Sequence, residues 1–179
     1  MKYETIADIY SANQNILEKL TIVLSGISPD EATALPDGEK WSIKQIAEHV
    51  SMVDFGVSRV CAKLLEAARS DGKPSDGSFE LSASFRQHAA EIANRKAEAP
   101  ERVQPTGGVT IAEAVETIRA SRTAFDSLRD DFEQYDFSGP KFPHPYFGDL
   151  TAGEWLVLVG LHEQRHTQQI ANLLEKIRQ

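Results

Sequence analysis

Apolar residues recur every three or four positions in four long stretches of the chain, which is the spacing typical of amphipathic helices. These stretches cover residues 5–26, 42–70, 110–132 and 151 to nearly the C-terminus. A shorter and more polar helix is expected over residues 79–98. No segment alternates apolar and polar residues for long enough to predict a β-sheet. The pattern therefore predicts an all-α fold, a four-helix bundle with one extra, shorter helix.

Three of the bundle helices open with a capping box, in which a Ser or Thr is followed three residues later by a Glu or Gln. The pairs are Ser42–Gln45, Thr110–Glu113 and Thr151–Glu154. In such a pair each side chain accepts a hydrogen bond from the backbone N–H of the other residue, which fixes the start of the helix. The sequence thus predicts where the second, third and fourth bundle helices begin.

The segment before the last bundle helix, residues 137–149, is a loop rich in proline and aromatic residues. Pro143 and Pro145 flank His144 and favour an extended backbone there. Since the loop leads directly into a helix with two histidines, His144 and Tyr146 are candidates for lining the mouth of a pocket. The alternative is a packed lid that takes no part in binding.

The last helix carries two histidines in the middle of its apolar stripe. At about 100° per residue, His162 and His166 share a face with apolar side chains on both sides of them. Those side chains are Trp155, Val159, Ile170, Leu173 and Ile177. Two unpaired imidazoles in such a stripe would cost about 1–3 kcal/mol each, whereas neutral imidazole is the commonest protein metal ligand. One turn of separation lets both rings reach one ion, so the spacing predicts two ligands of a metal site.

The second helix carries a further histidine, His49, at the edge of its apolar seam. Taken alone, His49 is typical of a boundary residue rather than a ligand. Its neighbour Glu48 is expected to point to solvent and is left out of any site. His88, in the polar helix, is expected at the surface or the boundary of the core.

Residues 162–166 also spell H-E-x-x-H, the pattern of zinc peptidases in which the glutamate is the general base. That class needs a third ligand further along the chain, and residues 167–179 contain no His, Asp or Cys. A peptidase is therefore disfavoured, although Glu163 remains a candidate base towards water, which would make the protein a hydrolase. Gln169 and Glu163 flank the histidine stripe and are candidates for outer contacts to the ligands.

Composition narrows the class of protein. The chain has 179 residues, of which 41% are hydrophobic, and this suits one domain over residues 1–179. Acidic residues outnumber basic ones by 27 to 19, which gives a net charge of −8. The basic residues are scattered and form no patch in the sequence, so no nucleic-acid partner is expected. The single cysteine, Cys61, is expected as a core thiol and favours a cytoplasmic protein. The sequence contains no run of about 18 apolar residues, so no membrane span is predicted.

Four segments of the sequence resemble the DinB-like (YfiT-like) metalloenzyme superfamily. They are Trp41–His49, Arg119–Arg122, Phe147–Trp155 and His162–Ile170. The resemblance covers nearly the whole chain in the right order. It implies an up-down four-helix bundle in which His49, His162 and His166 hold a divalent metal ion.

The resemblance also implies a type of reaction. Members of this family include S-transferases that use bacillithiol or mycothiol, and a mycothiol-dependent isomerase, while many have no known reaction. We therefore expect a transferase that joins a low-molecular-weight thiol to a small electrophilic substrate. The metal is expected to be zinc, nickel, manganese or iron, and the family's habits suggest a homodimer. A hydrolase with Glu163 as base and a non-catalytic metal-binding bundle are the alternatives.

Overall fold

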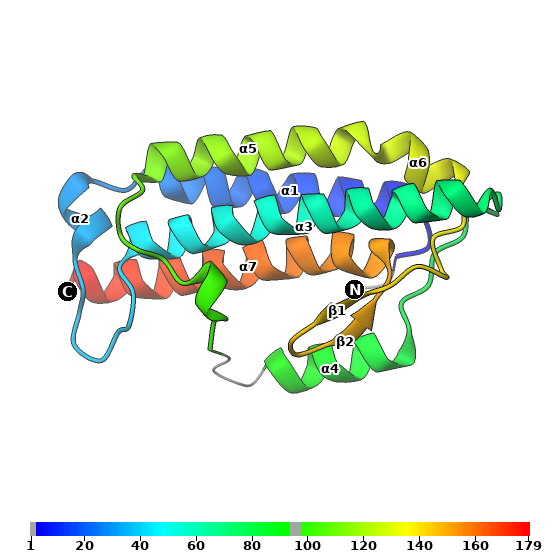
Figure 1. Ribbon diagram of the computed structural model, residues 1–179. Helices are drawn as coiled ribbons and strands as arrows, with labels where there is room; N and C mark the ends of the chain where they lie inside the picture. Colours follow the sequence, from blue (N-terminus) through cyan, green and yellow to red (C-terminus); the bar gives the residue numbers. More distant parts are fainter. Residues whose placement is uncertain (1–2, 94–97) are drawn as a thin grey trace.

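Four long helices form the body of the protein in the computed structural model, which describes residues 3–93 and 98–179 (Figure 1). They are α1 (Ile6–Ser25), α3 (Ile43–Asp71), α5 (Ile111–Ser127) and α7 (Ala152–Ile177). The four-helix bundle predicted from the apolar pattern is thereby confirmed. Its helices do not alternate strictly in direction: α3 and α5 run the same way, because the chain returns along the bundle between the end of α3 and the start of α5 (Figure 1).

Shorter elements connect the long helices. They are α2 (Pro29–Thr33), α4 (Ala83–Ala93), the 3-10 turn η1 (Glu101–Val103), α6 (Arg129–Gln134), and the strands β1 (Phe142–His144) and β2 (Gly148–Leu150). The polar helix expected over residues 79–98 is α4, and the last part of that range, residues 94–97, lies outside the described residues. No helix in the part of the chain that the structure describes has an apolar stretch long enough to cross a membrane.

Two sequence-based expectations need correction. The helix expected over residues 110–132 is interrupted by a turn at Leu128, whose N–H bonds to the carbonyls of Phe125 and Asp126, and α6 follows it. The loop at residues 137–149 contains an antiparallel hairpin, with Phe142 opposite Leu150. Strands of three residues are too short to show a period-two pattern, so periodicity could not predict them. Gly148 adopts a positive φ of 69° at the start of β2, a conformation that favours glycine.

All three predicted capping boxes are present, with Ser42, Thr110 and Thr151 as the N-cap residues. Two further boxes, Thr5–Asp8 and Ser28–Glu31, open α1 and α2. Five helix starts are therefore fixed locally by residues three positions apart.

The four long helices are arranged in a ring, in which each helix has two neighbours. Helix α1 packs against α7, α7 against α3, and α3 against α5. The side between α5 and α1 completes the bundle and is packed less closely than the other three. The edge formed by α3 and α7 and the edge formed by α5 and α1 therefore lie on opposite sides of the bundle.

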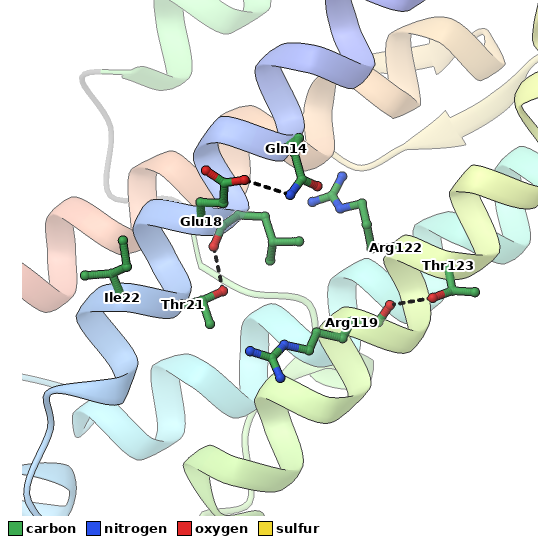
Figure 2. A pocket seen from close by; sticks show the side chains of 8 residues that line it. Gln14, Glu18, Thr21, Ile22, Arg119, Arg122 and Thr123 are labelled. Atoms are coloured by element: carbon green, nitrogen blue, oxygen red, sulfur yellow. Dashed lines mark hydrogen bonds between the residues drawn. The ribbon is translucent and has the colours of Figure 1, made fainter.

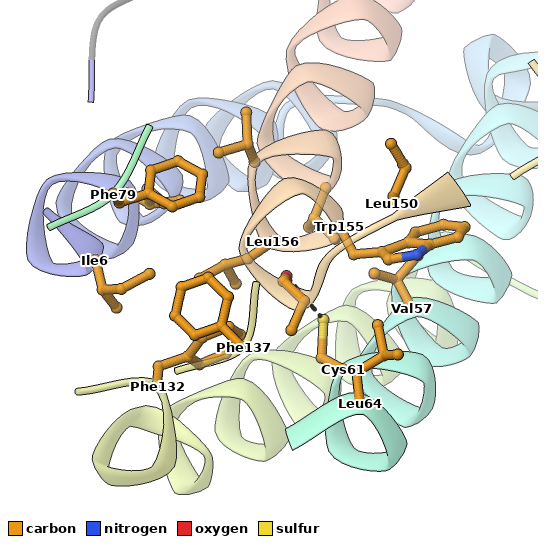
Figure 3. Close-up of a cluster of buried hydrophobic side chains, with 14 of the residues drawn as sticks. Ile6, Val57, Cys61, Leu64, Phe79, Phe132, Phe137, Leu150, Trp155 and Leu156 are labelled. Atoms are coloured by element: carbon orange, nitrogen blue, oxygen red, sulfur yellow. Dashed lines mark hydrogen bonds between the residues drawn. The ribbon is translucent and has the colours of Figure 1, made fainter. Parts of the chain in front are cut away.

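The apolar core consists of two clusters at the two ends of the bundle. The first joins the start of α1, the end of α3 and the start of α7 with several phenylalanines (Figure 3). Cys61 lies in it, fully buried, as expected for a core thiol. The second joins the end of α1, the start of α3, the start of α5 and the end of α7.

Six of the buried polar residues lie at the middle of the bundle, between the two apolar clusters. They are Asn13, His49, Asp54, Arg122, Glu163 and His166, and we call them the polar layer. This layer contributes residues from all four long helices. Natural interiors keep such groups only where they find partners, so the layer is the place to look for a site.

Candidate metal centre

Three histidine side chains meet where α3 and α7 pack together. His49 comes from α3, and His162 and His166 come from successive turns of α7. The Nε2 atom of His162 lies 3.1 Å from Nε2 of His49 and 3.1 Å from Nε2 of His166. One nitrogen from each ring lies within 4.8 Å of the others, so the three side chains could hold one metal ion. Helix spacing brings the two α7 rings together, and only packing of α3 on α7 adds the third.

Hydrogen bonds at the far side of two rings fix which nitrogen carries a proton. The Nδ1 atom of His49 lies 2.7 Å from the carbonyl oxygen of Val103, and that of His166 lies 2.8 Å from Oε1 of Gln169. Both oxygens accept, so each Nδ1 carries a hydrogen and each Nε2 keeps its lone pair. Nδ1 of His162 is buried and meets no partner among the described residues. Gln169 thus contacts the ring of His166 on the side away from the other two histidines.

Burial keeps these imidazoles neutral. Desolvation lowers the pKa of His49, and it lowers the pKa of His166 to about 3, with the charge of His49 adding to the effect. The pKa of His162 falls well below its usual value, through burial first and then through the neighbouring histidines. At neutral pH all three rings are therefore in the form that binds metals.

The spacing of the nitrogens fits a single cation. Nitrogens bound to one zinc ion lie about 3.3 Å apart in a tetrahedral arrangement and about 2.9 Å apart where they subtend a right angle. The two separations measured from His162, both 3.1 Å, fall between these values, and the third pair lies within 4.8 Å. Three histidine ligands leave at least one coordination position for another group.

Glu48 is buried against residues 98–110, the linker that precedes α5. The expectation that Glu48 faces solvent is wrong. Its carboxylate accepts hydrogen bonds from the backbone and hydroxyl of Thr106, at 3.0 and 2.8 Å, and from the backbone of Gly107, at 2.7 Å. Burial acts to raise its pKa, but these hydrogen bonds outweigh that effect and lower it. The helical pattern of α3 gives no sign that an irregular segment folds over this face. Glu48 thereby holds the linker whose Val103 carbonyl orients His49.

His144 packs against the start of α7. Its Nδ1 accepts from the backbone of Tyr146 and Phe147, at 3.1 and 3.3 Å, and its ring lies 5.1 Å from that of Trp155. Burial lowers the pKa of His144 to about 4, and a charge on His144 would in turn lower the pKa of His162. Because Nδ1 accepts, neutral His144 carries its proton on Nε2.

The Tyr146 hydroxyl donates to the Glu98 carbonyl and so ties the hairpin to the linker. The linker reaches His49 through the Val103 carbonyl, and the hairpin is joined to that linker through Tyr146.

Glu163 belongs to a buried charged group rather than to the histidine cluster. Nη2 of Arg122 donates to both of its carboxylate oxygens, at 2.8 and 3.0 Å. Asp54 also shares a hydrogen bond with Glu163, and burial raises the pKa of both acids, with the charge of Glu163 raising that of Asp54 further. One proton shared by the two acids leaves one negative charge opposite Arg122. The carboxylate is thus engaged on another face of α7, about 100° from His162.

The sequence reasoning missed Asp54 and Arg122, although a signal for both was available. Asp54 follows Val53 and precedes Val57 in the apolar seam of α3, and Arg122 lies between Ile118 and Phe125 in that of α5. A charged residue inside an apolar stripe predicts a buried partner.

A four-helix bundle that gathers three histidines from two neighbouring helices defines a class of candidate metal-binding proteins. Residues 12–170 match the DinB superfamily. This match spans most of the chain, and the protein belongs to that family.

A relative from Bacillus subtilis (strain 168), named "Uncharacterized protein YuaE", is 27% identical over 163 residues, which cover 86% of this chain and 90% of that protein. A solved structure described as "Crystal structure of TT2238, a four-helix bundle protein" aligns with a TM-score of 0.55 and 19% identity, over 93% of this chain and 98% of that one. The structural likeness shows the fold alone.

Proposed function

We propose that the protein is a metal-dependent transferase that joins a low-molecular-weight thiol to a small electrophile, with a divalent metal ion held by His49, His162 and His166. The observation that carries this proposal is the convergence of three Nε2 atoms, two of them in rings whose Nδ1–H groups are bound elsewhere. Such rings offer their lone pairs to one point without any rearrangement.

The chemistry expected of the site follows from its ligands. When bound, a divalent ion supplies the positive charge that lowers the pKa of a thiol at the open coordination position. In the transfer the thiol gives its proton to solvent water, the sulfur forms a bond to the electrophilic carbon, and the leaving group departs with the electron pair of the bond that breaks. We assign to neutral His144, whose proton is on Nε2, the donation of a hydrogen bond to the leaving group.

Side chains around the ligands hold them in place. The ring of Trp41 lies 4.9 Å from that of His49, and the Val103 carbonyl fixes the same imidazole from its other nitrogen. Packing and outer hydrogen bonds of this kind keep ligands in a productive geometry.

The rival hydrolase mechanism, with Glu163 as base, receives less support. A base must reach the proton that it removes. The Glu163 carboxylate is fully buried and already accepts two hydrogen bonds from Arg122. A thiol needs no such base, because the positive charge of the ion itself favours loss of the proton.

Metal analysis tests the first half of the proposal. Purified wild-type protein should carry about one ion per chain, as expected for a three-histidine site. His162→Ala should lose it, and His88→Ala, a histidine of α4 outside the cluster, should retain it. A wild-type preparation without metal after incubation with zinc, nickel, manganese and iron salts would overturn the assignment. Retained metal in His162→Ala would refute the ligand set.

A thiol screen tests the second half. Glutathione, bacillithiol and mycothiol are each incubated with monochlorobimane, whose fluorescence reports the formation of the carbon–sulfur bond. Turnover is expected with one thiol, and it should disappear on removal of the metal and return on its addition. A metal-loaded protein that turns over none of the three would refute the transferase and leave a metal-binding bundle.

A further inference from the structure

A groove opens between α1 and α5, on the side of the bundle opposite the histidines. Its volume is about 590 Å³, within the range of sites that hold small molecules. Gln14, Leu17, Glu18, Thr21, Ile22, Arg119, Arg122 and Thr123 line it. Figure 2 shows the two arginines reaching from α5 towards α1. The histidines lie on α3 and α7, so this groove is separate from the candidate metal centre.

Arg122 forms the inner wall of the groove and retains donor capacity. Its side chain is more than nine-tenths buried, yet it also lines the opening. Nη2 is occupied by Glu163, while the Nε–H is buried and meets no partner in the described part of the chain. Buried donors in natural proteins are nearly always paired. The guanidinium therefore keeps donor capacity beyond its two bonds to Glu163, beside a groove that Arg122 itself lines.

Arg119 provides a second positive charge on the same face of α5. It lies three residues before Arg122, which brings both side chains to one side of the helix. It is exposed, and within residues 3–93 and 98–179 it takes part in no ion pair. Guanidinium groups bind carboxylates and phosphates through several hydrogen bonds at once. Two of them along one groove predict an anionic ligand.

The other lining residues narrow the ligand. Glu18, whose carboxylate accepts from the amide of Gln14 at 3.0 Å, places a negative charge on the α1 side. A phosphate dianion would be repelled by it, and a single negative charge would be repelled less. Leu17 and Ile22 supply apolar surface beside the arginines, and the hydroxyls of Thr21 and Thr123 are turned to the backbone of their own helices.

We propose that this groove is a second ligand site, which binds a small monocarboxylate with an apolar body through Arg119 and Arg122. The carboxylate accepts from the two guanidinium groups, and the apolar part lies along Leu17 and Ile22. The inference does not rest on the transferase reaction, since it involves neither the histidines nor a thiol.

Titration of benzoate into ¹⁵N-labelled protein, followed by amide chemical shifts, tests the site directly. Saturable shifts are expected in α1 and α5, around residues 14–22 and 119–123. Benzyl alcohol, which lacks the charge, and inorganic phosphate should each bind more weakly than benzoate. Benzoate shifts that do not saturate, or that centre on the three histidines, would overturn the proposal, as would phosphate binding as tight as that of benzoate.

Two variants at the rim of the groove avoid disturbing the buried charges. Arg119→Gln removes a charged hydrogen-bond donor and should weaken benzoate binding about tenfold. Ile22→Glu, at a side chain that is 71% exposed, adds a repelling charge and should weaken it about fivefold. The matched controls are Arg59→Gln and Leu35→Glu, which change exposed residues outside the groove and should leave the affinity unchanged. Equal affinities in all four variants would refute the site.

Discussion

Removing the carboxylate of Glu48 should weaken metal binding, although Glu48 is not a ligand. The carboxylate makes three hydrogen bonds of 2.7–3.0 Å to Thr106 and Gly107. These bonds hold the linker whose Val103 carbonyl lies 2.7 Å from Nδ1 of His49. In Glu48→Ala the linker is released, and His49 is free to rotate or to change its tautomer.

The expected size of this effect follows from the position of Glu48, which acts on the ligand His49 through the linker. Hydrogen bonds to a charged group contribute about 1.5–3 kcal/mol each, but water replaces part of that at an exposed linker. Loss of an outer contact to a histidine ligand lowers metal affinity about 10–100-fold, or about 1.4–2.7 kcal/mol. We expect Glu48→Ala to fall in this range and Glu48→Gln, which keeps one acceptor oxygen, to be affected less.

Competition with a chromophoric zinc chelator measures the affinity in each variant. Glu113→Ala is the matched control, because Glu113 also accepts from the backbone and hydroxyl of one threonine, Thr110, but at the other end of the linker. The control should bind zinc as the wild type does. Wild-type affinity in Glu48→Ala, or an equal loss in Glu113→Ala, would refute the reasoning.

Three further predictions concern stability and catalysis. Because burial depresses the histidine pKa values, the unfolded metal-free chain takes up protons that the folded chain does not. The histidine contribution to its unfolding free energy should therefore be constant above about pH 7 and decline from there towards pH 3, and His166→Asn should show a shallower decline in urea titrations. Gly160→Ala would place a Cβ 2.1 Å from Oδ1 of Asn13 and should destabilise the protein by about 1–3 kcal/mol. Gly56→Ala has open space at its Cβ and should stabilise the protein by about 0.5–1 kcal/mol. Equal urea midpoints for the two variants would contradict this prediction. Glu163→Gln should lower stability by several kcal/mol yet retain thiol transfer per folded, metal-loaded molecule, and selective loss of turnover would restore Glu163 as a base.

The sequence predicted those features of the protein that depend on neighbouring residues. Four helices and three capping boxes follow from spacings of three and four positions, and each is present. The spacing of His162 and His166 likewise places both imidazoles on one face of α7 before any tertiary contact is considered. Only the resemblance to a family pointed to His49 as their partner, since nothing local distinguishes it from a boundary residue.

Features that depend on distant residues were not predicted in this way. Glu48 is polar and lies off the apolar seam of α3, so its burial is decided by residues 98–110 folding over it. Glu163 was singled out for its place in H-E-x-x-H, but Arg122 and Asp54, far away in the chain, decide what its carboxylate contacts. The hairpin at residues 142–150 is also invisible to periodicity, because each strand has only three residues.

The polar layer also determines how the helices are aligned with one another. Contacts between apolar side chains are not directional. A helix that slid along its neighbours would therefore still bury the apolar side chains at the two ends of the bundle. A slip of one turn would move Arg122 about 5.4 Å along the axis of α5, out of reach of Glu163, and would leave buried charges unpaired. Breaking such a pair is strongly unfavourable, so one alignment is selected among several that the apolar clusters alone would allow. That same alignment sets the height of His49 on α3 opposite His162 and His166 on α7.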